Sequence, residues 1–146
     1  LKKVSPSDQI LVTSKKSELG CSVLIVLPGV GAMEECVEAV ANISVDEQEF
    51  KSVGERMSVF DDINPHALYA PNKSKIKVTA LTKLELAIAI APGFGNFPAR
   101  HIRPDEMSSE VRGDGSNERF ICNILPEQDK ADSFYSDLNL CIDYQD

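Results

Sequence analysis

Hydrophobic and polar residues alternate along two segments in the middle of the chain, a period of two that is typical of β-strands. Residues 75–81 read KIKVTAL, so the apolar side chains fall on one face and the lysines on the other. Residues 84–91 read LELAIAIA, which places large apolar residues on one face and mainly alanines on the other. Alanine and leucine also favour helix, but this alternation and the following Pro92-Gly93 favour a strand. Its small face allows another layer to pack closely.

Two apolar runs bounded by glycine or proline predict further strands. Residues 21–27 read CSVLIVL between Gly20 and Pro28-Gly29, and residues 119–125 read RFICNIL before Pro126. Residues 33–43 fit both helical spacing and alternation, and Asn42 is suited to a turn because asparagine tolerates the left-handed conformation. Short strands with frequent turns predict a single all-β domain, either a sandwich or a barrel.

The segment GERMSVFDDINPHALYAP, residues 54–71, combines apolar runs with an acidic turn and a histidine. We expect a strand over 56–60, a loop over 61–65 and a second strand over 67–69. His66 follows Pro65 directly, so we expect it to have a loop role rather than a catalytic one.

Composition narrows the classes of function. The chain has 146 residues and a formal net charge of −8, so it is a poor candidate for nucleic-acid binding. No apolar run approaches the roughly 20 residues needed to cross a membrane, and the first residues lack the apolar core of a signal peptide. The four cysteines form no CxxC pair, which favours reduced thiols over a zinc knuckle. We therefore expect a cytoplasmic protein without nucleic-acid or membrane partners.

Motifs for chemistry are sparse. The two histidines, His66 and His101, form neither an HxH nor an HExxH pattern, so we predict no metal site in this chain. His101 is a weak candidate for a catalytic base, because it is flanked by Arg100 and Arg103 but has no orienting partner visible in the sequence. The candidate ligand-binding residues are four arginines that are clustered in an acidic chain: Arg100, Arg103, Arg112 and Arg119.

Guanidinium groups hold carboxylates and phosphates in a bidentate way, which is why these arginines are candidates. The alternative is that they pair with acidic neighbours in the same stretch, such as Asp105, Glu110 and Glu118. Most surface ion pairs have no function.

Several segments, taken in order and spacing, resemble the 5-deoxy-glucuronate isomerase family of bacterial inositol catabolism. The resemblance runs from about Gly20 to Ser133. Its most specific parts are GER at 54–56 with SVF at 58–60, FPAR at 97–100, RG at 112–113 with Asn117, and NILP at 123–126.

The resemblance implies a cupin-like double-stranded β-barrel, or jelly roll. Members of this family are bicupins that interconvert an aldose and a ketose form of a sugar acid, yielding 2-deoxy-5-keto-gluconate. They are ketol-isomerases, which are intramolecular oxidoreductases. The family's metal site of histidines and a glutamate lies in a second cupin, which is absent here, so the resemblance implies no cofactor in this chain. The implied partner is a small sugar acid, and a homo-oligomer is possible.

The sequence departs from the family pattern in three places. After Ser133 it reads FYSDLNLCIDYQD, without the His-x-His segment that opens the metal site. Ala41-Asn42 stands where a Ser-Gly turn is expected, and the region around residues 33–35 is shortened. We therefore expect an amino-terminal cupin-like domain over 1–133 and a divergent or truncated tail over 134–146.

Three functions remain open. The first is the non-metal, amino-terminal half of the isomerase, which is expected to be inactive alone. The second is a stand-alone cupin that binds a sugar acid without turnover, and the third is an inactive remnant.

Overall fold

The computed structural model describes residues 2–13, 21–29, 38–58, 61–93, 96–126 and 137–142. These residues form almost entirely antiparallel β-structure, arranged in three sheets. The first sheet has the order β1 (Lys2–Val4), β8 (Leu84–Pro92), β3 (Cys21–Gly29), β6 (His66–Ala70) and β9 (Arg100–Ile102). The second sheet has the order β2 (Gln9–Thr13), β7 (Lys75–Ala80), β4 (Ala41–Val45) and β5 (Gln48–Val53).

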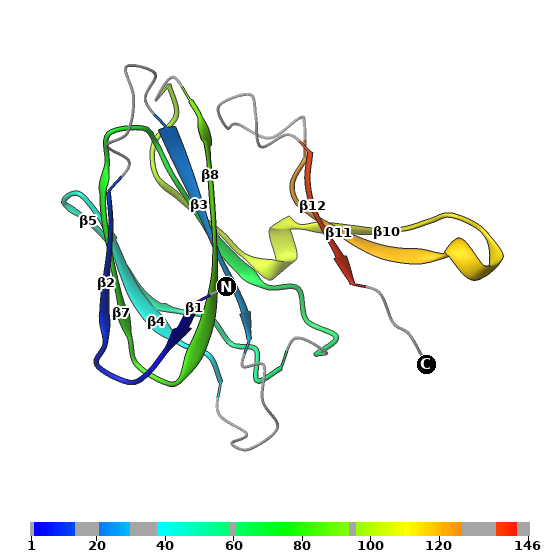
Figure 1. Ribbon diagram of the computed structural model, residues 1–146, viewed down its shortest axis with the longest axis horizontal. Coiled ribbons are helices and arrows are strands. Elements are labelled where there is room, and N and C mark those ends of the chain that lie inside the picture. The colour runs from blue at the N-terminus through cyan, green and yellow to red at the C-terminus, as the bar shows by residue number, and fades with distance from the viewer. Residues whose placement is uncertain are drawn as a thin grey trace.

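The third sheet has the order β10 (Ser108–Arg112), β11 (Arg119–Pro126) and β12 (Asp137–Ile142). Two short 3-10 helices accompany it: η1 (Pro104–Glu106) leads from β9 into β10, and η2 (Gly115–Asn117) joins β10 to β11. Figure 1 shows the first two sheets facing each other, with the hairpin of β10 and β11 projecting away from them. Within the described part of the chain, no helix is long and apolar enough to cross a membrane.

The main hydrophobic core lies between the first and second sheets. Alternate residues of each strand point into it, including Ile25 of β3, Leu86 of β8, Ile43 of β4 and Val78 of β7, and each is at most 1% exposed. Burying one such aliphatic side chain contributes about 1.5–3 kcal/mol relative to leaving it exposed. The two facing antiparallel sheets confirm the predicted all-β, cupin-like fold.

A second core lies on the other face of the first sheet. Leu24 and Val26 of β3 and Tyr69 of β6 pack there with Cys122 and Ile124 of β11. Strand β3 is therefore buried on both faces, which explains its continuous apolar run. The partly buried alanines of β8 also pack against this core, so the prediction of a close-packing small face is confirmed.

The predicted strands at 75–81, 84–91, 67–69 and 119–125 are confirmed as β7, β8, β6 and β11. The predicted strand at 21–27 is also present, but the turn expected at Pro28-Gly29 is wrong because β3 continues through both residues. Its pairing with β8 shifts register between Val26 and Gly29. A proline is tolerated within a strand at such an irregularity, where the regular hydrogen-bonding ladder is interrupted.

Two further predictions are wrong. Residues 56–58 are not a strand, and residues 59–60 lie outside the described residues. Asn42 is not in a turn but inside β4, where its side-chain oxygen accepts a hydrogen bond from the backbone of Ser52 at 2.9 Å. Of the open region 33–43, residues 41–43 belong to β4 and residues 33–37 lie outside the described part.

Residues 137–142 of the expected tail form β12, which pairs with β11. The expected domain boundary at 133 stays a prediction.

Candidate functional site

Two histidines that are far apart in the sequence meet at the end of the first sheet. His66 is the first residue of β6, and His101 lies in the neighbouring strand β9, opposite Leu68. Because side chains alternate along a strand, His66, Leu68 and His101 share the face that looks toward the second sheet. Nδ1 of His66 lies 2.8 Å from Nε2 of His101, which is a hydrogen-bond distance.

The two imidazole rings meet edge to edge. Their centroids are 5.0 Å apart and their planes differ by 26°. Rings stacked face to face at that separation would not bring two nitrogens to 2.8 Å, so the nearly coplanar arrangement is that of an in-line hydrogen bond. His66 is buried, and the prediction that it occupies a loop is wrong, since β6 begins at this residue.

Glu55 and Phe50 complete the surroundings of this pair. Oε1 of Glu55 lies 3.2 Å from Nε2 of His66, at ion-pair distance but without the alignment of a good hydrogen bond. The Glu55 side chain is 49% exposed and that of His66 is 11% exposed. Phe50 of β5 contacts His101 edge-on, with centroids 6.4 Å apart. His101 of the pair therefore lies between its own strand β9 and β5, which are the edge strands of the first and second sheets. The solvent-exposed carboxylate of Glu55 lies beside His66.

The electrostatic environment keeps His101 neutral near pH 7. Burial lowers the pKa of His101, the adjacent His66 lowers it further, and Arg103 adds a smaller effect in the same direction. Glu106 opposes these effects. A neutral imidazole can accept a proton, which is the chemistry expected of a base. In this pair, however, Nε2 of His101 is already hydrogen-bonded to His66.

The segment GER supplies Glu55 and depends on the glycine before it. Gly54 has φ +113°, and a Cβ at this position would lie 1.9 Å from the carbonyl oxygen of Ala39. The backbone N–H of Ala39 donates to the carbonyl of Arg56 at 2.8 Å, so the two segments lie side by side. Only glycine has the conformation and the small size that this approach requires.

Arg56 organises the loop that follows. Arg56 is 1% exposed, and its Nη2 donates to the carbonyl of Asp61 at 3.1 Å. Oδ2 of Asp61 accepts hydrogen bonds from the backbone of Met57 at 2.7 Å and of Ser58 at 3.1 Å. Residues 56–58 are thus tied to the acidic turn, which explains why they do not form the expected strand.

A cleft of about 320 Å³ lies beside Arg56, between this loop and the third sheet. Its lining includes Asp61, Asp62, Phe120 and Cys122. Burial raises the pKa of the Cys122 thiol and nearby Arg56 opposes this, so the thiol stays protonated. The lining carries one cation and two carboxylates, a balance that does not favour an anionic ligand.

The four arginines predicted as ligand contacts do not form one cluster. Arg100 is partly buried on β9 and lies opposite Tyr69, on the other face of the strand from His101. Arg103 is exposed before η1, and its Nε lies 3.6 Å from Asp105. Arg112 and Arg119 face each other across the β10–β11 hairpin, which projects away from the stacked sheets (Figure 1).

Acidic neighbours hold at least two of these arginines. Arg112 pairs with Glu110, and hydrogen bonds from Asn123 and Arg112 lower the pKa of that carboxyl. The pairs of Arg103 and Arg112 agree with the alternative that such residues only form local ion pairs. The assignment of the four arginines to ligand binding stays a prediction.

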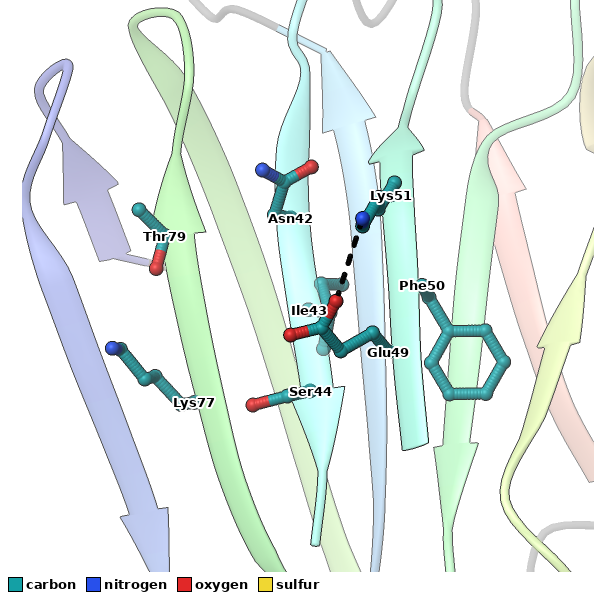
Figure 2. A pocket seen from close by; sticks show the side chains of 8 residues that line it. All are labelled: Asn42, Ile43, Ser44, Glu49, Phe50, Lys51, Lys77 and Thr79. Carbon is teal, nitrogen blue, oxygen red and sulfur yellow. Dashed lines mark ion pairs between the residues drawn. The ribbon is translucent and has the colours of Figure 1, made fainter. Parts of the chain in front are cut away.

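A hollow of about 200 Å³ lies over β4, β5 and β7 of the second sheet. Figure 2 shows Asn42 and Ser44 of β4 in its middle, Lys77 and Thr79 of β7 on one side, and the ion pair of Glu49 with Lys51 of β5 on the other, whereas Phe50 points away. The side chains of Lys51 and Glu49 are 77% and 67% exposed. Such solvated groups define a ligand poorly, so this hollow is a weaker candidate than the histidine pair.

The sequence did not reveal the His66–His101 pair because the two residues are 35 positions apart and meet only when β6 and β9 pair. The orienting partner that His101 lacked in the sequence is His66. Among the described residues, no group of three or more histidine, cysteine or carboxylate side chains is placed to hold a metal ion. The predicted lack of a metal site stays a prediction.

Relatives of known name match much of this chain. Residues 32–136 match the KduI/IolB family. A protein named 5-deoxy-glucuronate isomerase from Geobacillus thermodenitrificans is 48% identical over 93 residues, which are 64% of this chain and 34% of that protein. Its namesake from Geobacillus kaustophilus is 44% identical over 93 residues, with the same shares of both chains.

The fold has a solved counterpart. The crystal structure of an IolB-like protein from Salmonella typhimurium superposes with a TM-score of 0.75 at 35% sequence identity, and the match covers 89% of this chain and 44% of that one. The chain thus spans about a third of the length of the two Geobacillus relatives and less than half of this structural one. Because the family match covers well over half of its residues, the chain belongs to the KduI/IolB family.

Proposed function

We propose that this chain is the amino-terminal part of a 5-deoxy-glucuronate isomerase, which interconverts the aldose and ketose forms of a sugar acid. The single observation that carries this proposal is the 48% identity to a relative of that name. The resemblance of the segment Gly54, Glu55 and Arg56 to this family also supports it.

In this proposal the chain supplies packing and assembly, and the remainder of the enzyme would hold the family's metal and would carry out the proton transfer. Isomerisation at a carbonyl needs a base and an electrophile that stabilises the developing negative charge. His101 is hydrogen-bonded to His66, and Arg103 is exposed beside Asp105, so neither supplies a preorganised pair of this kind. The sugar acid is the proposed ligand of the whole enzyme.

The expected location is the cytoplasm. Cys122 is a free thiol, which suits a reducing compartment.

A chimaera tests the proposal. The 93 aligned residues of the Geobacillus thermodenitrificans relative are replaced by the matching residues of this chain, and isomerisation of 5-deoxy-glucuronate is followed by NMR. We expect the chimaera to keep activity within about tenfold of the parent. The same chimaera carrying Gly54→Ala is expected to lose soluble, active protein, whereas Gly115→Ala, at an open position, is the matched control.

A folded chimaera without activity contradicts the proposal. Calorimetry on the unaltered chain then distinguishes the remaining alternatives, since binding of the sugar acid without turnover indicates a binding module.

A further inference from the structure

The contacts among Glu55, His66 and His101 allow only a few distributions of protons over the ring nitrogens. The contact between Nδ1 of His66 and Nε2 of His101 requires one proton between the two nitrogens. If His66 carries its proton on Nε2, beside Glu55, then His101 donates from Nε2. If one proton is added, His66 carries a proton on both nitrogens, which keeps its hydrogen bond to His101 and places a positive charge beside Glu55.

When a second proton is added, no distribution of protons keeps the hydrogen bond between the two rings. Both rings would then be imidazolium, and two N–H groups would point at each other across 2.8 Å. The hydrogen bond would be lost and two like charges would face each other in a partly buried place. Glu55 is too far out to neutralise both rings, since its side chain is 49% exposed.

The hydrogen bond between the two histidines lies at an edge of the first sheet, where β9 pairs with β6 over three residues. Strand β9 has only three residues, pairs only with β6 among the described strands, and is an edge of the first sheet. His101 also touches Phe50 of the second sheet, so the same ring links the edges of the two facing sheets. Short edge strands are the parts of a sheet that open most easily.

We propose that the hydrogen bond between His66 and His101 holds β9 against β6, and that acidification opens this edge once both rings are imidazolium. The charged groups around the pair are Glu55 after β5, and Arg103 and Glu106 at η1, while β5 contributes the uncharged Phe50. Arg103 adds to the penalty for a second positive charge, and Glu106 reduces it.

The direction of the pH effect follows from His101. Its pKa in the folded chain is lowered from 6.5, mainly by burial and next by His66, so the unfolded chain binds more protons at mildly acidic pH. Stability from this group is therefore complete above pH 6.5 and is lost as the pH falls from there through the lowered folded pKa.

Ring-nitrogen NMR on the unaltered chain between pH 4 and 8.5 tests the proposal, because the chain contains only two histidines. We expect two coupled protonation steps separated by more than about one pH unit. Amide hydrogen exchange supplies the second readout. After correction for intrinsic rates, residues 100–102 should exchange at least about tenfold faster below the second step, while the central strand β3 should not change.

Two variants sharpen the test. His66→Gln should leave one titrating ring and abolish the acid-dependent release of residues 100–102. Glu55→Gln removes the half-exposed carboxylate beside His66 and should leave the hydrogen bond between the two rings, and the acid-dependent release of residues 100–102, in place. Independent titration of both rings near 6.5, or unchanged exchange of residues 100–102 through the second step, overturns the proposal.

Discussion

Replacing Gly54 by alanine should destabilise the chain far more than the same substitution at Gly115. The backbone at Gly54 has φ +113°, and such a conformation costs a residue with a side chain about 1–3 kcal/mol. The added Cβ would also lie 1.9 Å from the carbonyl oxygen of Ala39, so the backbone must shift. Forcing an extra group into a packed site costs roughly 1–3 kcal/mol.

That shift also threatens the hydrogen bond from Ala39 to Arg56, which has a length of 2.8 Å and a net value of about 1 kcal/mol. The expected total loss in the free energy of unfolding is therefore about 3–7 kcal/mol, a large part of the stability of a domain of this size. Urea denaturation followed by circular dichroism measures this loss.

Gly115→Ala is the matched control. Gly115 has φ +57°, but no atom lies within 4 Å of an added Cβ, so only the conformational cost of about 1–2 kcal/mol applies. The reasoning is refuted if Gly54→Ala costs no more than Gly115→Ala.

Two further predictions concern the charged residues and metal. Arg103→Ala should change the free energy of unfolding by less than about 1 kcal/mol, because its ion pair with Asp105 is exposed; a larger loss in urea denaturation would give this arginine a structural role beyond that pair. Elemental analysis of the dialysed chain should find well under one tightly bound transition metal per chain, because His66 and His101 bind each other rather than converge on a common point. One zinc, iron or manganese per chain, lost in His101→Ala, would contradict this.

The sequence predicts strands in which burial determines where the apolar residues stand. β7 and β8 alternate because one face lies in the main core, and β3 is continuously apolar because both faces are covered. The edge strands β5 and β10 were not predicted. Most of their residues are exposed, so no burial pattern marks them, and their pairing partners alone define them.

The candidate site was only partly predictable for a similar reason. His101 and the arginines stand out by residue type, but the contact of His101 with His66 arises from the pairing of β6 with β9, which no local pattern encodes. The proline in β3 predicts a turn from the sequence alone, but the irregularity that accommodates it depends on the neighbouring strand β8. The histidine contact and the irregularity in β3 thus depend on pairing between strands that are distant in the sequence.

The proposal that this chain is a non-catalytic part of the isomerase is tested most directly by an NMR time course with 5-deoxy-glucuronate. The purified chain is assayed with and without added divalent metal, with the Geobacillus thermodenitrificans relative as the positive control. We predict no conversion by the chain above the uncatalysed rate in either condition, while the control converts the substrate. Conversion by the chain that disappears in His101→Ala would contradict the proposal and make the His66–His101 pair a catalytic site.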